Sequence, residues 1–178
     1  MEINIIVPAG GKSSRYNTGK PKWLRTHPDG KLMIEHALQA LVKNNYKLNI
    51  YIITNSDIQR EFDVQSILKD STLSSAELIL LPHSTNSAVE TIYKGIKYHA
   101  KKFNYSLPTI LKDSDNYVEL SEDIKWGKSN FTVGLNLNKV DTNRIKSKSF
   151  LVVDEFNNVV DFIEKQVVSD KISVGTHC

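Results

Sequence analysis

Residues 3–24 read INIIVPAGGKSSRYNTGKPKWL, and this stretch says most about how the chain folds. It opens with the apolar run Ile3 to Val7, which is rich in β-branched residues and predicts a buried strand. A Pro-Ala step then leads to two adjacent glycines, Gly10 and Gly11. Because glycine has no side chain, a ligand can approach the backbone closely at this point.

The polar residues that follow the glycines are of the kinds that bind a polyphosphate. They comprise two hydroxyls, an arginine and two lysines: Lys12, Ser13, Ser14, Arg15 and Lys22. A guanidinium fork, ammonium groups and free backbone N–H groups together suit a run of phosphates. The stretch contains neither the Gly-x-x-x-x-Gly-Lys-[Ser/Thr] loop nor Gly-x-Gly-x-x-Gly, since its glycines are adjacent. An ordinary turn with solvated basic residues is the alternative interpretation.

The pattern x-Ala-Gly-Gly-x-x-x-Arg, followed by Pro-Lys-x-Leu, resembles the signature of nucleotidylyltransferases with a GT-A-like fold. Sugar-1-phosphate nucleotidylyltransferases are the largest group of this kind. The resemblance implies that Arg15 and Lys22 are catalytic charges. It also implies that the nucleotide contacts Pro8, Ala9, Gly10, Gly11, Lys12, Ser13 and Ser14. Pro8 departs from the family, which more often has Leu or Ala there.

Strand and helix patterns alternate over the first two thirds of the chain. Helices are predicted at 33–42, 56–69 and 86–102, and strands at 48–53, 77–81 and 109–111. This alternation predicts a mostly parallel sheet covered by helices on both faces. The resemblance implies the same fold class, a three-layer α/β/α Rossmann-like (GT-A-like) domain with a mixed, mostly parallel sheet.

From Tyr117 onward the patterns favour strands alone. They are predicted at 130–137, 149–153, 159–164 and 171–174, with a hairpin connection at 154–158. We expect these strands to extend the same sheet, so that residues 1–178 form a single domain. Residues 1–116 would be its nucleotide-binding half, and 117–178 an acceptor-binding half that is incomplete by comparison with the family.

Two carboxylates, Asp113 and Asp115, follow the strand predicted at 109–111. In open α/β sheets, ligands bind beyond the carboxyl ends of the strands. Mg²⁺ takes one or two protein carboxylates and completes its shell with phosphates and water. The family's metal position matches Asp115 first and Asp113 second, and an Asx turn at a strand end is the alternative.

Two further segments resemble the family. Residues 85–91 are similar to its Thr-x-Gly-Ala-Ala-Glu-Thr segment, which implies nucleotide contacts from Ser87, Ala88 and Glu90. Ser87 and Glu90 also form a capping-box pattern, and the two interpretations are compatible. The pair Glu164 and Lys165 corresponds to the family's acceptor-binding Glu-Lys, and Asn116 is placed with them on the acceptor. A solvated pair at a strand end is the alternative for Glu164 and Lys165.

Composition excludes several other classes. Net charge is +3 and the basic residues are scattered, so nothing favours nucleic acid. The longest apolar runs are too short to span a bilayer, and no signal peptide precedes them. The only cysteine is Cys178, so no internal disulfide can form, which fits a cytoplasmic protein. The five histidines show no metal-ligand spacing.

The sequence thus favours a Mg²⁺-dependent nucleotidyltransferase of the pyrophosphorylase type. It would transfer a nucleoside monophosphate from a nucleoside triphosphate to a phosphorylated acceptor, such as a sugar 1-phosphate. The product would serve surface glycan precursor synthesis, as in capsule or polysaccharide biosynthesis. A GT-A-type glycosyltransferase and a non-catalytic nucleotide-binding domain remain as alternatives, and homo-oligomerisation is left open.

Overall fold

The computed structural model describes residues 1–11, 19–42, 46–118, 130–137 and 148–178. The chain divides into two compact units, Met1–Gly127 and Lys128–Cys178. The expectation of a single domain over residues 1–178, with its two halves, stays a prediction.

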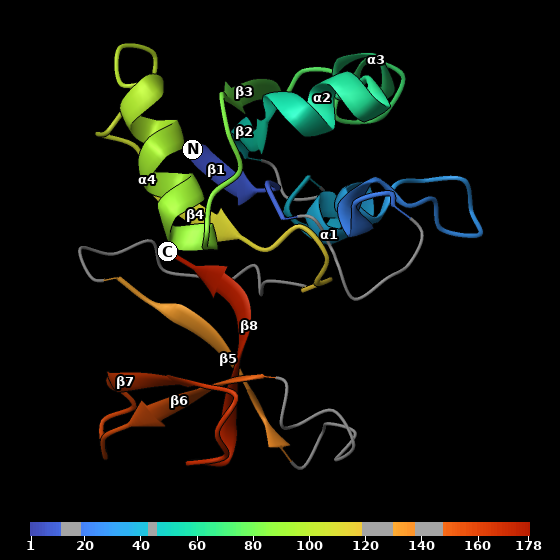
Figure 1. Ribbon diagram of the computed structural model, residues 1–178. Coiled ribbons are helices and arrows are strands. Elements are labelled where there is room, and N and C mark those ends of the chain that lie inside the picture. The colour runs from blue at the N-terminus through green and yellow to red at the C-terminus, as the bar shows by residue number, and fades with distance from the viewer. Residues whose placement is uncertain (12–18, 43–45, 119–129, 138–147) are drawn as a thin grey trace. The chain divides into compact units, whose positions relative to one another are not determined.

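Within the described residues of the first unit, four parallel strands pair to form a sheet (Figure 1). They are β1 (Glu2–Pro8), β2 (Lys47–Asn55), β3 (Glu77–Leu81) and β4 (Thr109–Lys112). Their order is β3-β2-β1-β4, so β1 lies between β2 and β4. The chain builds outward from β1 to β3 and then returns to the other side of β1, which makes the β1–β4 neighbourhood a topological switch point.

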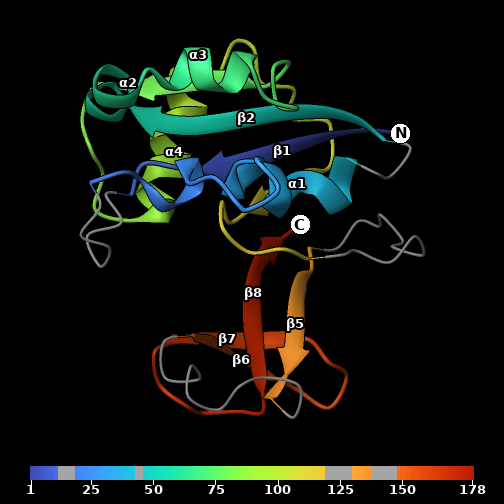
Figure 2. The same cartoon turned by 90° about the vertical axis from the view of Figure 1, so that its right-hand side faces the viewer.

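Helices cover both faces of this parallel sheet, as predicted. Figure 2 shows α1 (Met33–Val42) on one face and α4 (Ala88–Tyr98) on the other. Ile92 and Ile96 of α4 pack on a core formed by Ile6, Tyr51, Ile53, Ile79, Leu81 and Phe103. On α1, the side chains of Ile34, Ala37, Leu38 and Leu41 are buried, at the 3.6-residue spacing of one helical face.

The single helix predicted at 56–69 is wrong. The structure has two short helices there, α2 (Ser56–Phe62) and α3 (Val64–Lys69), separated by Asp63 in a left-handed conformation (φ 46°). The predicted Ser or Asp cap is also wrong. Asn55 caps α2, since its side-chain oxygen accepts hydrogen bonds from the backbone N–H groups of Asp57 and Ile58.

Gly95 lets α4 approach β2 closely. A Cβ placed there would lie 2.8 Å from Cγ2 of Ile53 and closer still to its Cδ1. Overpacking a core costs about 1–3 kcal/mol, and the higher helix propensity of alanine returns about 1 kcal/mol. We therefore expect Gly95→Ala to lower the free energy of unfolding in urea melts, with exposed Lys97→Ala as the control. An unchanged midpoint for Gly95→Ala would contradict this packing.

The second unit contains antiparallel strands. They are β5 (Thr132–Asn136), β6 (Ser149–Val153), β7 (Val159–Glu164) and β8 (Lys171–His177). Strand β8 pairs with β5 and β6, and β6 pairs with β7. The predicted hairpin connection at 154–158 is confirmed, because Asp154 and Asn158 exchange backbone and side-chain hydrogen bonds there.

The predicted fold class is confirmed. Helices lie on both faces of a parallel sheet in the first unit, and the antiparallel strands of the second unit complete a mixed pattern. None of the helices in the described part of the chain is long and apolar enough to cross a membrane.

Candidate nucleotide-binding site

A pocket of about 330 Å³ lies in the first unit, at the carboxyl ends of β1 and β4. We call it the β1–β4 pocket. Its lining residues come from three stretches that are distant in sequence: Pro8, Ala9, Gly10, Gly11, Lys22 and Trp23; Thr85, Asn86, Ser87, Ala88 and Thr91; Ser114 and Asp115. This is the switch-point position at which open α/β sheets bind ligands. Eight of the residues proposed from the sequence are therefore brought together here.

The backbone after β1 is held in place by the end of β2. Ala9 N–H donates to the Ile53 carbonyl at 2.7 Å, which continues the strand pairing. The Thr54 hydroxyl donates to the Ala9 carbonyl at 3.0 Å, and the Asn55 amide donates to the Gly10 carbonyl at 3.3 Å. Thr54 and Asn55 are buried. The sequence analysis did not identify Thr54 and Asn55 as residues that position the backbone after β1. A pair of polar residues at the end of an apolar strand could have indicated this role.

Gly11 has no close neighbour among the residues that the structure describes. A Cβ built on Gly11 would meet no atom of that described part of the chain within 4 Å, and one on Gly10 would meet Thr91 at ordinary contact distance, 3.5 Å. Neither glycine has a positive φ. Packing and backbone conformation therefore do not require glycine here, whereas a ligand lying against the backbone would.

Lys22 and Asp115 form an ion pair in the pocket, with Nζ and Oδ2 2.5 Å apart. Lys22 begins a 3₁₀ turn, η1 (Lys22–Leu24), which is anchored by the buried side chains of Trp23 and Leu24. Asp115 follows β4. Both charged side chains are about one-third exposed, at 31% and 30%. The Lys22 ammonium and the Asp115 carboxylate are thus both accessible to a ligand that enters the pocket from solvent.

Buried Lys112 shapes the loop that carries Asp115. It is 1% exposed, and its Nζ donates to the backbone carbonyls of Asp113 and Asn116. Burial lowers the pKa of Lys112, while the charges of Asp113 and Asp115 oppose that shift. Lysine at a strand end is usually solvated, so the sequence did not single it out.

Asp113 and Asn116 are not among the residues that line the pocket. The Asn116 amide donates to Asp113 Oδ2 at 3.2 Å, so the two side chains contact each other. Of the two candidate carboxylates, Asp115 is the one that the structure places on the pocket. The predicted metal-binding roles of Asp115 and Asp113 stay predictions.

The amino terminus of α4 forms another side of the pocket. Ser87 is its N-cap, since its hydroxyl accepts from Glu90 N–H at 3.1 Å. The Glu90 carboxylate accepts from the N–H of Asn86, one residue before the cap, and pairs with Lys94. The capping interpretation therefore holds for Ser87 and Glu90. Glu90 does not line the pocket, whereas Ser87 and Ala88 do.

Other predicted site residues cannot be compared with this pocket. Lys12, Ser13, Ser14 and Arg15 lie outside the described residues. Glu164 and Lys165 belong to the second unit, where their side chains form an ion pair of 2.6 Å. Their predicted roles stay predictions.

Two histidines converge despite their spacing in sequence. The sequence shows no metal-ligand spacing among the histidines, but in the structure ring nitrogens of His27 and His36 both lie near the Asp29 carboxylate. A local spacing rule misses them, because one lies in a turn and the other on α1.

Comparison with solved structures identifies the fold. A nucleoside-diphosphate-sugar pyrophosphorylase from Vibrio cholerae matches 97% of this chain and 71% of its own, with a TM-score of 0.70 at 16% identity. The chain has the nucleotidylyltransferase fold. UDP-glucose pyrophosphorylase complexed with UDP-glucose matches at a TM-score of 0.70 and 15% identity, over 99% of this chain and 75% of that one. The inositol-1-phosphate CTP transferase from T. maritima matches at a TM-score of 0.70 and 16% identity, over 98% of this chain and 69% of that one.

The nucleotidylyltransferase fold suggested by residues 3–24 is therefore confirmed at the level of structure. No protein-family model matches the sequence. A search of curated proteins gives no match either. At these identities the likeness establishes the fold.

Proposed function

We propose that this protein is a nucleotidylyltransferase that joins a nucleoside monophosphate to a phosphorylated acceptor and releases pyrophosphate. The observation that carries the proposal is the arrangement of the β1–β4 pocket. The open backbone at Gly10 and Gly11, the Lys22 ammonium and the Asp115 carboxylate all border one cavity at the switch point. The similar solved structures are two pyrophosphorylases and a CTP transferase, which supports the same reaction class.

In the proposed reaction, an acceptor phosphate oxygen attacks the α-phosphorus of the triphosphate. The bond from that phosphorus to the bridging oxygen breaks, and pyrophosphate leaves with the additional negative charge. Lys22 and Arg15 would neutralise that charge. Such transfer needs positioned reactants and fixed charges rather than a covalent intermediate.

A divalent cation fits the donor set of the pocket. Asp115 offers one carboxylate at the cavity, and Mg²⁺ commonly uses one or two carboxylates together with substrate phosphates. Asp115 is the first candidate to hold the ion and Asp113 the second. When bound, Mg²⁺ would supply charge neutralisation at the phosphates. The Lys22 ammonium now pairs with Asp115 and would turn toward the phosphates of an arriving nucleotide.

The acceptor is proposed to be a sugar 1-phosphate or a related phosphorylated metabolite, and the product an activated precursor for a surface glycan. Glu164, Lys165 and Asn116 are the residues proposed to contact it. The backbone of Lys165 adopts a left-handed conformation (φ 59°), which is uncommon for a residue other than glycine.

The test is a pyrophosphate-release assay with CTP, UTP, dTTP, GTP and ATP, each with and without a panel of sugar 1-phosphates. Release that requires both a triphosphate and an acceptor would support the proposal. A glycosyltransferase would release no pyrophosphate and would consume a nucleotide sugar instead. A non-catalytic domain would bind a nucleotide without turning it over.

Gly11→Ala gives a sharper test of the pocket. We expect its thermal stability to match that of the unmodified protein, because the added methyl group would meet no atom of the described residues, which are 1–11, 19–42, 46–118, 130–137 and 148–178. Turnover should fall by up to about 10²-fold, the cost of displacing a reactant by an ångström. Thermal melts and the pyrophosphate assay would be run on the same sample. Unchanged turnover would show that the nucleotide does not lie against Gly11.

A further inference from the structure

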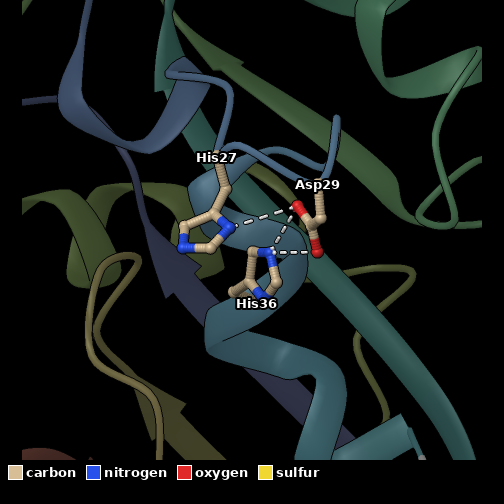
Figure 3. Close-up of side chains that lie close together, drawn as sticks. All are labelled: His27, Asp29 and His36. Carbon is tan, nitrogen blue, oxygen red and sulfur yellow. Dashed lines mark hydrogen bonds and ion pairs between the residues drawn. The ribbon is translucent and has the colours of Figure 1, made fainter.

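His27, Asp29 and His36 bring three metal-binding atoms together at one place on the first unit (Figure 3). His27 Nδ1 lies 3.3 Å from Asp29 Oδ1, and His36 Nε2 lies 3.0 Å from the same carboxylate. All three ligand atoms lie within 4.8 Å of one another. None of the three residues lines the β1–β4 pocket.

The backbone fixes this arrangement in advance. His27 and Asp29 lie in a tight turn, in which Gly30 N–H donates to the His27 carbonyl at 2.9 Å and His27 N–H donates to the Lys31 carbonyl at 2.7 Å. Gly30 has φ 87°, a conformation that favours glycine. His36 projects from α1, which starts three residues after the turn. Two adjacent segments thus hold the three side chains.

We propose that His27, Asp29 and His36 form a binding site for a divalent transition-metal ion of the Zn²⁺ class, separate from the nucleotide pocket. Two imidazole nitrogens and one carboxylate oxygen suit Zn²⁺, Co²⁺ or Ni²⁺. Mg²⁺ and Ca²⁺ prefer all-oxygen ligands. At metal–ligand bonds of about 2.0–2.1 Å, neighbouring ligands of a tetrahedral ion lie about 3.3 Å apart. The two distances to Asp29 are close to that separation.

The carboxylate is oriented by the backbone and is open to solvent. Asp29 Oδ1 accepts a hydrogen bond from the Lys31 backbone N–H at 3.1 Å, which holds the carboxylate beside the two imidazole rings. The His27 and Asp29 side chains are 55% and 44% exposed. A bound ion would therefore keep coordination positions open to water, as three-ligand zinc sites do.

The position of the cluster gives the ion a structural effect. The turn at 26–30 joins η1, which carries Lys22, to α1. An ion bridging His27 and Asp29 to His36 would tie this turn to the helix. Because it would bind the folded chain in preference to the unfolded one, it should raise the melting temperature in a concentration-dependent way.

The test is metal binding by the full chain without an affinity tag, using Zn²⁺ for calorimetry and Co²⁺ for visible absorption. We expect one ion per chain, a rise in melting temperature with Zn²⁺, and no such rise with Mg²⁺ at the same concentration. His27→Ala and Asp29→Asn should each weaken Zn²⁺ binding at least about tenfold. Circular dichroism would check that each variant is folded.

Two control variants distinguish this site from incidental binding. His83→Ala removes an exposed histidine outside the cluster, and Cys178→Ser removes the only thiol. Both should bind Zn²⁺ like the unmodified protein. Loss of binding in either control, or equal binding in His27→Ala, would overturn the proposal. Absence of stoichiometric Zn²⁺ binding would overturn it too. The cluster would then be a set of hydrogen bonds that connects the turn to α1.

Discussion

Replacing Lys22 by alanine should lower turnover by about 10²–10³-fold, the effect of removing a charge or donor aimed at a transition state. The fold should survive, because the ion pair with Asp115 is about one-third exposed and pairs of this kind contribute little to stability. Pyrophosphate release would be measured with saturating nucleotide and acceptor. Lys69→Ala, at an exposed position on α3, is the matched control.

Near-normal turnover in Lys22→Ala would remove Lys22 from the proposed mechanism. A loss of turnover accompanied by a lower melting temperature would point instead to a structural role of the pair. Both measurements are therefore needed on each sample.

Asp115→Asn should have an effect of similar size, about 10²–10³-fold, since metal-assisted charge stabilisation contributes several kcal/mol. Asp113→Asn should cost less, because the Asp113 side chain contacts Asn116 rather than lining the pocket. The measurement is turnover as a function of Mg²⁺ concentration for both variants. Equal Mg²⁺ dependence in both variants and the unmodified protein would place the metal elsewhere.

The double variant Lys22→Ala/Asp115→Asn tests whether the two residues act on the substrates or only neutralise each other's charge. If the two residues served only to neutralise each other, removing both would restore what either single change loses. If each acts on the substrates, the double variant should stay at least as impaired as the single variants. The double-mutant cycle gives this coupling directly.

The parts of the fold that follow from local patterns were predicted from the sequence. Ile3 to Val7 is a buried strand because its β-branched residues suit a central position. α1 spans the predicted residues because its apolar face repeats at helical spacing. The glycines after β1 and Asp115 after β4 meet because parallel strands bring their carboxyl ends to one edge.

The features that sequence reasoning missed depend on tertiary contacts. No glycine or proline near Asp63 indicates that the helix ends there. In the structure, Ile58 of α2 and Val64 and Leu68 of α3 are buried on either side of this break. In the sequence, Lys112 has the pattern of a surface lysine. Its burial becomes understandable only from the two loop carbonyls that accept its hydrogen bonds. His27 and His36 are joined only when the turn folds back on α1.

Nucleotide binding is tested most directly by calorimetric titration of the protein with each of the five triphosphates in the presence of Mg²⁺. We predict saturable one-to-one binding of at least one of them, weakened in Gly11→Ala and unchanged in Lys69→Ala. If none of the triphosphates binds, the β1–β4 pocket is not a nucleotide site and the proposed reaction is wrong.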